Sequence, residues 1–322
     1  MLEKKELLDK IKELSNNWKA PDSYTDVPHG DMPGDKVEIN DGHIEKALTL
    51  FPEVLKILPE FVKKNEYGRA VIVVCGGSGV GKSENASLLT YFFEQAGIGS
   101  YTLSGDNYPY RIPMYNDAER LRVFQQSGLK KMIEDGVYTK ENFDIIHEFQ
   151  KLGDDANENN IMKYDFVKSY IEGGREGLRN YLGTNNEIEF SELSRITSEF
   201  KNGAKNIWLK RMGRTEGELW YEDEDFSDKN ILIIEWTHGN SDNYTGADIP
   251  ILLNSTPQET LEHRRARNRD GKTDSPFTMR VLELEQEMLE NQAYKAKIIL
   301  SKSGKILSYN EYCKLMEESK SK

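Results

Sequence analysis

The chain has 322 residues, which is enough to bury a full core as one large α/β domain or two modest ones. Its net charge of -12 and pI near 5.1 argue against a protein that coats nucleic acid or anionic membrane, so any basic site has to be local. No apolar run approaches the roughly 20 residues that span a bilayer, and the first residues lack a signal-peptide core, which predicts a cytoplasmic protein. With only Cys75 and Cys313 present, neither a disulfide nor a cysteine metal cluster is expected.

Residues 1–68 predict an N-terminal helical extension. Apolar residues recur at helical spacing from Leu7 to Leu14 and again across 44–62, and a polar, turn-rich stretch at 21–42 separates them. We expect these helices to pack on the rest of the chain or on another subunit, so a homodimer is one expectation. Residues 69–322 are assigned to the main domain.

A glycine-rich sequence follows the apolar run at 71–75. Residues 76–83 read Gly-Gly-Ser-Gly-Val-Gly-Lys-Ser, and a strand before them with a helix after them is the context that the Walker A motif requires. The glycines let successive N–H groups turn toward phosphate oxygens, Lys82 reaches the β- and γ-phosphates, and Ser83 ligates Mg²⁺. The alternative is a glycine-rich turn that binds nothing.

We therefore predict that the chain binds a nucleoside triphosphate with Mg²⁺. ATP is the expected nucleotide, and GTP stays open. The predicted nucleotide-binding residues are Gly76, Gly77, Ser78, Gly79, Val80, Gly81, Lys82, Ser83 and Glu84.

The remaining pattern predicts strands that alternate with helices. A helix over 84–95 and a strand over 100–104 complete a first βαβ unit, and apolar runs at 231–234, 249–253 and 297–300 are typical of buried parallel strands. Thr256 to Glu259 has the pattern of a capping box at a helix start, and a further helix is expected from Tyr309. We predict an α/β fold with a mainly parallel sheet and helices on both faces.

Residues 112–228 predict an inserted subdomain. The segment is mostly helical and polar, and it is too long for a connection between neighbouring strands of a compact sheet. We interpret it as an acceptor-binding or lid subdomain within the main domain. The acidic stretch at 216–228 is expected to be a solvated loop.

Two carboxylates follow predicted strands, at the end of the sheet where ligands of open α/β folds bind. Asp106 comes just after the strand at 100–104, and Glu235 ends the strand at 231–234. Phosphoryl transfer needs one group that accepts the proton of the acceptor hydroxyl and others that hold Mg²⁺. Asp106 is the predicted base, and Ser83, Asp106 and Glu235 are the predicted metal ligands. The alternative for Asp106 is an ordinary turn residue in Gly-Asp-Asn.

An arginine-rich run at 264–272 is unusual in so acidic a chain. Arg264 and Arg267 lie one helical turn apart, and we predict that they are catalytic lid residues that close over the triphosphate. The alternative is a solvated basic face.

The sequence gives less information about the acceptor site. The predicted substrate contacts are Tyr108, Arg111, Arg211, Arg214 and His238. The arginines at 211 and 214 could bind a phosphate or carboxylate in a bidentate manner, or they could pair with the acidic run at 222–225. His238 could equally be a structural loop residue.

With these motifs the chain resembles the superfamily of small-molecule kinases that includes uridine kinase, phosphoribulokinase, type I pantothenate kinase and glycerate kinase. The match covers the phosphate loop, the segment from Ser104 to Tyr108, the strand ending at Glu235 and the block from Asp248 to Arg269. The resemblance implies a P-loop NTPase-like fold and the ATP- and Mg²⁺-dependent phosphorylation of a hydroxyl of a small metabolite. It also implies a catalytic role for the Asp of a Ser-x-Asp-x-Tyr element, here Asp106.

Several alternatives stay open. Glu84 replaces a second hydroxyl residue that is common after the Walker serine, and residues 128–228 match no acceptor motif of the family. The acceptor could be a nucleoside, a sugar or sugar phosphate, or a pantothenate- or glycerate-like compound. The segment from Leu103 to Asn107 is also similar to adenylylsulfate kinase. A regulatory P-loop NTPase switch and a polynucleotide kinase are alternatives from other classes, and the net acidity weighs against the second.

Overall fold

The computed structural model describes residues 1–35, 37–256, 258–262 and 275–320. The chain divides into two compact units: unit 1 comprises Met1–Tyr108, Glu189–Ser255 and Leu289–Lys322, and unit 2 comprises Pro109–Ile188 and Thr256–Met288. None of the helices in the described part of the chain is both long and apolar enough to cross a bilayer. Cys75 and Cys313 are free thiols.

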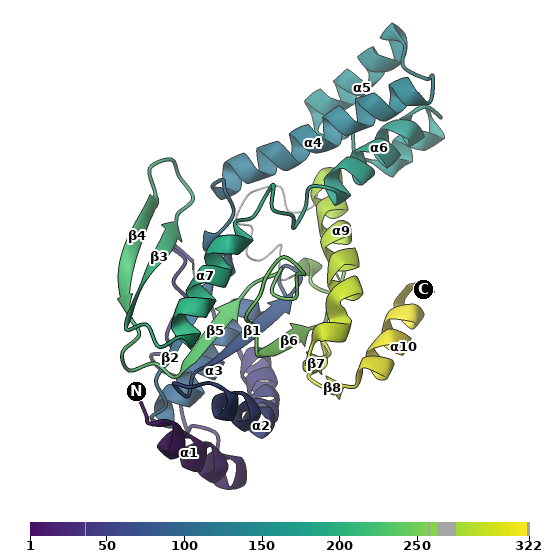
Figure 1. Cartoon of the computed structure of the whole chain (residues 1–322). Helices are drawn as coiled ribbons and strands as arrows, with labels where there is room; N and C mark the ends of the chain where they lie inside the picture. Colours follow the sequence, from purple (N-terminus) through teal and green to yellow (C-terminus); the bar gives the residue numbers. More distant parts are fainter. Residues whose placement is uncertain (36, 257, 263–274, 321–322) are drawn as a thin grey trace. The chain divides into compact units, whose positions relative to one another are not determined.

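Unit 1 contains a six-stranded sheet, a separate two-stranded sheet and most of the helices that surround them (Figure 1). Its helices are α1 (Lys4–Asn17), α2 (Asp41–Lys64), α3 (Lys82–Gln95), α7 (Phe190–Lys201) and α10 (Tyr309–Lys320), with short 3₁₀ turns η1 (Gly105–Asn107) and η3 (Ala293–Lys295). Its strands are β1 (Ala70–Gly76), β2 (Ser100–Ser104), β3 (Asn206–Met212), β4 (Leu219–Asp225), β5 (Ile231–Glu235), β6 (Ile249–Leu253), β7 (Ile298–Leu300) and β8 (Ile306–Leu307).

The large sheet has the strand order β2-β5-β1-β6-β7-β8, and its first five strands are parallel. Among the strands of this sheet that the structure describes, only β8 runs antiparallel to its neighbour. Ser104 of β2 and Val74 of β1 both pair with Glu235 of β5, so the three strands end at nearly the same level. The predicted P-loop NTPase-like α/β fold, a mainly parallel sheet flanked by helices, is confirmed.

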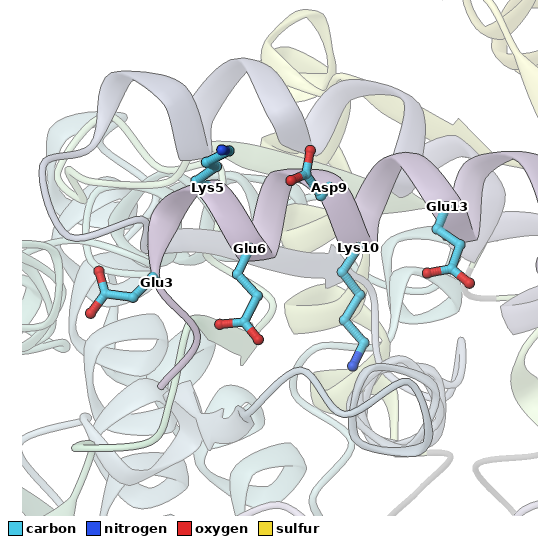
Figure 2. A pocket seen from close by; sticks show the side chains of 6 residues that line it. All are labelled: Glu3, Lys5, Glu6, Asp9, Lys10 and Glu13. Carbon is cyan, nitrogen blue, oxygen red and sulfur yellow. The ribbon is translucent and has the colours of Figure 1, made fainter.

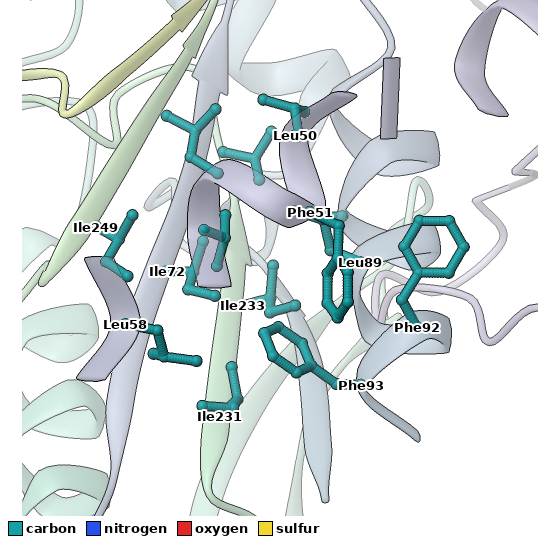
Figure 3. Packing of buried hydrophobic residues seen from close by; sticks show 14 of the residues in the cluster. Leu50, Phe51, Leu58, Ile72, Leu89, Phe92, Phe93, Ile231, Ile233 and Ile249 are labelled. Atoms are coloured by element: carbon teal, nitrogen blue, oxygen red, sulfur yellow. The ribbon is translucent and has the colours of Figure 1, made fainter. Parts of the chain in front are cut away.

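The N-terminal helices form part of the main core of unit 1. Figure 3 shows Leu50, Phe51 and Leu58 of α2 packed with Phe92 and Phe93 of α3 over apolar residues of β1, β5 and β6. Leu7 and Ile11 of α1 are fully buried in the same cluster, which by area would stabilise the fold by roughly 1.5–3 kcal/mol each. The extension is therefore continuous with the core that positions the phosphate loop.

On the opposite face of the sheet, the C-terminal elements cover part of β1, β6 and β7. Cys75, Leu252 and Ile299 pack there with Leu289 and Tyr312. Because side chains alternate along a strand, β1 directs Ile72 and Val74 toward α2 and α3 and Cys75 toward this second layer. Burial on both faces explains the continuous apolar runs of these strands.

The predicted insertion boundaries differ from the observed units. Residues 189–228 belong to unit 1, where α7 precedes the antiparallel hairpin β3–β4. Residues 219–225 of the acidic stretch at 216–228, which the sequence assigned to a solvated loop, form the strand β4. Its side chains are almost all exposed, so it lacks the alternation of apolar and polar residues that would mark a strand.

Unit 2 is helical. It contains α4 (Pro113–Glu134), α5 (Lys140–Leu152), α6 (Val167–Arg179), the 3₁₀ turn η2 (Glu158–Met162) and most of α9 (Pro276–Gln292). Its core includes Phe124, Tyr170 and Leu284. The buried carboxylate of Glu187 accepts hydrogen bonds from Arg120 Nε at 2.5 Å and Asn116 Nδ2 at 3.0 Å, which fixes the end of the helical segment onto α4.

The capping box at Thr256 is confirmed. The Glu259 amide donates to Thr256 Oγ1 at 3.2 Å, and the Thr256 amide donates to Glu259 Oε2 at 2.8 Å. Arg264 and Arg267, the predicted lid residues, lie outside the described residues.

Candidate active site

The glycine-rich loop joins β1 to α3 in a conformation that only glycine tolerates at several positions. Gly79 and Gly81 have φ values of +78° and +94°, in the left-handed region. A Cβ on Gly76 would lie 2.6 Å from the carbonyl oxygen of Leu253, so the loop approaches β6 too closely for any side chain there. The helix α3 begins directly at Lys82, with its free N–H groups at the loop.

The residues of this loop have the environment that a phosphate site needs. Lys82 is partly exposed, and its Nζ donates a 3.1 Å hydrogen bond to the Gly77 carbonyl oxygen within the loop. Ser78 is exposed at the tip, whereas Val80 is buried and anchors the loop to the core. Glu84, the residue that departs from the family pattern, is fully buried in the first turn of α3 and so lies in the protein interior.

Glu235 links three elements at the strand ends. Ser83 Oγ of α3 lies 3.2 Å from Glu235 Oε2, and the Ser104 hydroxyl of β2 donates to Glu235 Oε1. Burial raises the pKa of Glu235 to about 8, with a further raising effect from the charge of Asp106, while the charge of Lys82 lowers it. The charges of Lys82 and Asp106 both affect the pKa of Glu235, so the predicted base and the predicted phosphate-binding lysine lie near the same carboxylate.

Asp106 is held at the surface by buried neighbours. It is exposed, whereas Gly105 and Asn107 on either side are buried. A Cβ on Gly105 would lie 2.1 Å from Cγ of Trp236, so the turn packs directly against the residue that follows β5. The arrangement presents the Asp106 carboxylate beyond the carboxyl end of β2 on a firmly packed turn.

ATP and Mg²⁺, which the Walker A motif implies, fit these residues. The loop amides and Lys82 would hold phosphate oxygens. Ser83 and Glu235 already place a hydroxyl and a carboxylate oxygen together at the first turn of α3, and these would hold Mg²⁺, with phosphate oxygens and water completing its shell. A bound cation would lower the pKa of Glu235 from its raised value.

Two predicted substrate contacts are buried in packing positions. Tyr108 is fully buried, and burial raises its pKa above the ordinary range. His238 is 9% exposed, and its ring lies edge-on against Trp236 at 5.5 Å between ring centroids. These surroundings favour the structural alternative for His238 that the sequence left open.

The predicted substrate arginines are engaged in other contacts. Arg211 is 3% exposed and forms ion pairs with Glu222 at 2.9 Å and Glu224 at 2.5 Å, which is the pairing with the acidic run that the sequence left as an alternative. Arg214 lies in the turn of the hairpin, where its amide donates to Glu218 Oε2 at 2.9 Å. Arg111 is in unit 2, where it donates to the Tyr181 hydroxyl at 3.0 Å.

Sequence reasoning missed two acidic residues of the extension. Asp31 accepts hydrogen bonds from the Ser104 amide and from Asn107 on either side of Asp106, and the charge of Asp35 contributes to the raised pKa of Glu235. Both lie in the polar, turn-rich stretch at 21–42, where no strand or helix period marks them. Ser104 was visible only as the first residue of the Ser-x-Asp-x-Tyr element.

A separate surface pocket lies along α1. Figure 2 shows its lining, six charged residues on the exposed side of the helix: Glu3, Lys5, Glu6, Asp9, Lys10 and Glu13. Acidic and basic side chains are mixed there and come from α1 and its N-cap residue Glu3, which is typical of a solvated helix face. The converging polar groups of unit 1 are instead at the phosphate loop.

Comparisons with known proteins give one substantial sequence similarity. No family model matches the chain. A bifunctional alpha-galactosidase/sucrose kinase of Mediterraneibacter gnavus is 39% identical over 242 residues, which are 75% of this chain and 21% of that protein. The chain therefore spans about a fifth of the length of this curated relative.

Similar solved structures, at lower identity, include the following two. A candidate fructose transport system kinase from Silicibacter sp. TM1040 is 13% identical, with 77% of this chain and 94% of that chain covered and a TM-score of 0.46. A protein described as a possible uridine kinase from Bacillus stearothermophilus is 14% identical, with 77% and 98% covered and a TM-score of 0.36. Together, the phosphate loop, the parallel sheet and the similarity to the M. gnavus protein confirm the resemblance to P-loop small-molecule kinases.

Proposed function

We propose that this chain transfers the γ-phosphoryl group of ATP to a hydroxyl group of a small metabolite in a Mg²⁺-dependent reaction. The observation that carries the proposal is the convergence of Lys82, Ser83, Asp106 and Glu235 at the ends of β1, β2 and β5. Ser83 bonds to Glu235, and the pKa of Glu235 responds to the charges of both Lys82 and Asp106. Phosphoryl transfer needs a cationic cradle, Mg²⁺ ligands and a proton acceptor in this proximity.

In the proposed reaction the acceptor oxygen forms a bond to the γ-phosphorus while the bond from that phosphorus to the bridging oxygen of ADP breaks. Lys82 and the loop amides stabilise the negative charge on the transferred group. The exposed carboxylate of Asp106 orients the acceptor hydroxyl and takes its proton, which passes on to solvent. Mg²⁺, held by Ser83 and Glu235, would neutralise charge on the β- and γ-phosphates.

Sugars are the first acceptors to test. The relative that is 39% identical over 75% of this chain has a sucrose kinase activity in its name. We therefore place sucrose and other sugars ahead of nucleosides, pantothenate and glycerate in the proposed order of acceptors. Fixed polar contacts to several hydroxyl groups would let such a site discriminate among sugars.

The proposal is tested by ADP release from purified protein with ATP and Mg²⁺. The panel contains sucrose, fructose, glucose, uridine, pantothenate, glycerate and adenylylsulfate, and mass spectrometry identifies any phosphorylated product. We expect one sugar to raise ADP release well above the rate without acceptor and to gain one phosphate. Lys82→Met should abolish this rate, whereas Lys12→Met on the exposed face of α1 should leave it unchanged.

Two results would redirect the assignment. Phosphorylation of adenylylsulfate alone would identify an adenylylsulfate kinase. Slow ADP release that is equal with every acceptor and yields no phosphorylated product would contradict the metabolite kinase and favour an NTPase switch.

A further inference from the structure

The polar segment between α1 and α2 reaches the edge of the large sheet. Trp18 packs edge-on against Phe92 of α3 with 5.4 Å between ring centroids, and the Tyr91 hydroxyl donates to the Ser23 carbonyl oxygen at 3.1 Å. Further along, a Cβ on Gly30 would lie 3.7 Å from the Thr102 methyl group of β2. These contacts carry the chain across α3 and bring Asp31 beside the edge strand.

The Asp31 carboxylate is fully used by four hydrogen bonds. Its Oδ1 accepts from the Ser104 amide at 2.7 Å and from Asn107 Nδ2 at 3.1 Å. Its Oδ2 accepts from Arg211 Nη1 at 2.9 Å and from the Tyr101 hydroxyl at 3.2 Å. One carboxylate offers about four such positions, so Asp31 has little capacity left for a ligand of its own.

These bonds hold the turn of Asp106 from both ends. β2 is an edge strand, and the Ser104 N–H on its free side would otherwise have no partner in the sheet. Asn107 is tied a second time, because its Oδ1 accepts from the Met212 amide of β3 at 3.0 Å. Asp106 therefore lies between two residues that Asp31 fixes, although Asp31 is 73 residues from Ser104 in the sequence.

The interaction with Arg211 holds Asp31 in place. The side chain of Asp31 is 6% exposed and that of Arg211 is 4% exposed, so the pair is shielded from water. Arg211 is further fixed by Glu222 and Glu224 of β4. A buried pair of this kind gives little net stability, but its geometry is demanding, which suits a positioning role.

We propose that Asp31 is a positioning residue for phosphoryl transfer, which sets the Ser104–Asn107 turn so that Asp106 meets the acceptor hydroxyl. This inference rests on the proposed function, because it assigns Asp31 a part in the same reaction. It also gives the N-terminal extension a role in the active site beyond packing.

The test compares Asp31→Asn with Asp22→Asn, a matched loss of charge at an exposed position of the same segment. Asp31→Asn keeps the shape of the side chain but weakens its hold on Arg211. We expect kcat to fall roughly 10- to 100-fold, the scale of a small misplacement of a reacting group. We expect the Kd for ATP to stay within about threefold of wild type, because the phosphate loop is unchanged. Asp22→Asn should match wild type in both.

A second variant tests whether a lower kcat in Asp31→Asn results only from loss of folded protein. Asn107→Ala removes the hydrogen bond from Asn107 Nδ2 to Asp31 and leaves the buried Asp31–Arg211 pair intact. It should therefore lower kcat in the same way. If the two residues act through one turn, the double variant should lose little more than the worse single variant. Unchanged kcat in Asp31→Asn, independent multiplicative losses in the double variant, or an equal loss of ATP binding would overturn the proposal.

Amide hydrogen exchange separates this inference from the proposed kinase activity. If wild-type protein phosphorylates no acceptor, the proposed function fails. Exchange across residues 104–107 still tests whether Asp31 holds this turn in place. Faster exchange there in Asp31→Asn than in Asp22→Asn would support the positioning role, and equal exchange would overturn it.

Discussion

Ser83 Oγ donates a 3.2 Å hydrogen bond to Glu235 Oε2, which joins the first turn of α3 to the end of β5. The second oxygen of the same carboxylate accepts from Ser104 of β2. A single buried side chain thus connects the glycine-rich loop to the strand that leads into Asp106. Changes at these few residues should separate nucleotide binding, metal use and chemistry from one another.

Glu235→Gln should raise the Mg²⁺ concentration needed for half-maximal activity. Glutamine keeps an oxygen that can accept from one serine, but it removes the negative charge that would attract the cation. We expect a shift of roughly tenfold or more. Titration of Mg²⁺ in the ADP-release assay measures it, with the exposed Glu13→Gln on α1 as the control. An unchanged Mg²⁺ dependence would contradict the assignment of Glu235.

Asp106→Asn should lower turnover while leaving ATP binding nearly intact. The exposed carboxylate is the proposed proton acceptor, and asparagine cannot take a proton at neutral pH. We expect kcat to fall by about 100-fold or more. Stopped-assay kinetics and the Kd of a fluorescent ATP analogue give the two quantities, and the exposed Asp9→Asn serves as the control. Turnover that survives the substitution would rule out Asp106 as the base.

Gly105→Ala should reduce both stability and activity. A Cβ at this position would lie 2.1 Å from Trp236 Cγ, so either the indole or the turn of Asp106 has to move. We expect a loss of about 1–3 kcal/mol in the free energy of unfolding. Urea denaturation measures it. Gly42→Ala is the comparison, because a Cβ there would find its nearest contact at 3.4 Å, and the variant should be as stable as wild type. Equal stability of the two variants would contradict the close packing of Gly105.

The stability difference between wild type and Asp31→Asn should depend on pH. Burial raises the pKa of Asp31 from the ordinary 3.8 to about 6, although Arg211 and the Ser104 amide act to lower it. The native state then binds this proton more tightly than the unfolded state, so the contribution is full below about pH 4 and is lost as pH rises through about 6. The variant lacks this titration.

Urea denaturation at several pH values across this window tests the sign. The free energy of unfolding of wild type should decrease relative to Asp31→Asn as pH increases. Tyr101 and Glu224 also face this carboxylate, so Asp22→Asn provides the reference for titration elsewhere in the chain. A relative increase with pH would show that Arg211 dominates over burial.

The sequence by itself determined the local parts of this protein. The phosphate loop follows from glycine spacing, and the strands at 231–234 and 249–253 follow from apolar runs that are buried in the sheet. Asp106 and Glu235 were predicted because they lie at the carboxyl ends of the predicted strands at 100–104 and 231–234. These features depend on neighbours in the chain and on backbone conformation, so they leave a pattern that can be recognised in one sequence.

Features that depend on contacts between residues far apart in the sequence were decided only by the tertiary structure. The hairpin strand β4 was missed because an exposed strand rich in charge has no apolar alternation. Arg211 was predicted to bind substrate, but the fold surrounds it with Asp31, Glu222 and Glu224. Asp31 itself lies in a segment without periodicity, and its role arises from a hydrogen bond to a backbone amide 73 residues away. A single sequence carries no local signal for such a contact, because its energy depends on where the fold brings the two groups together.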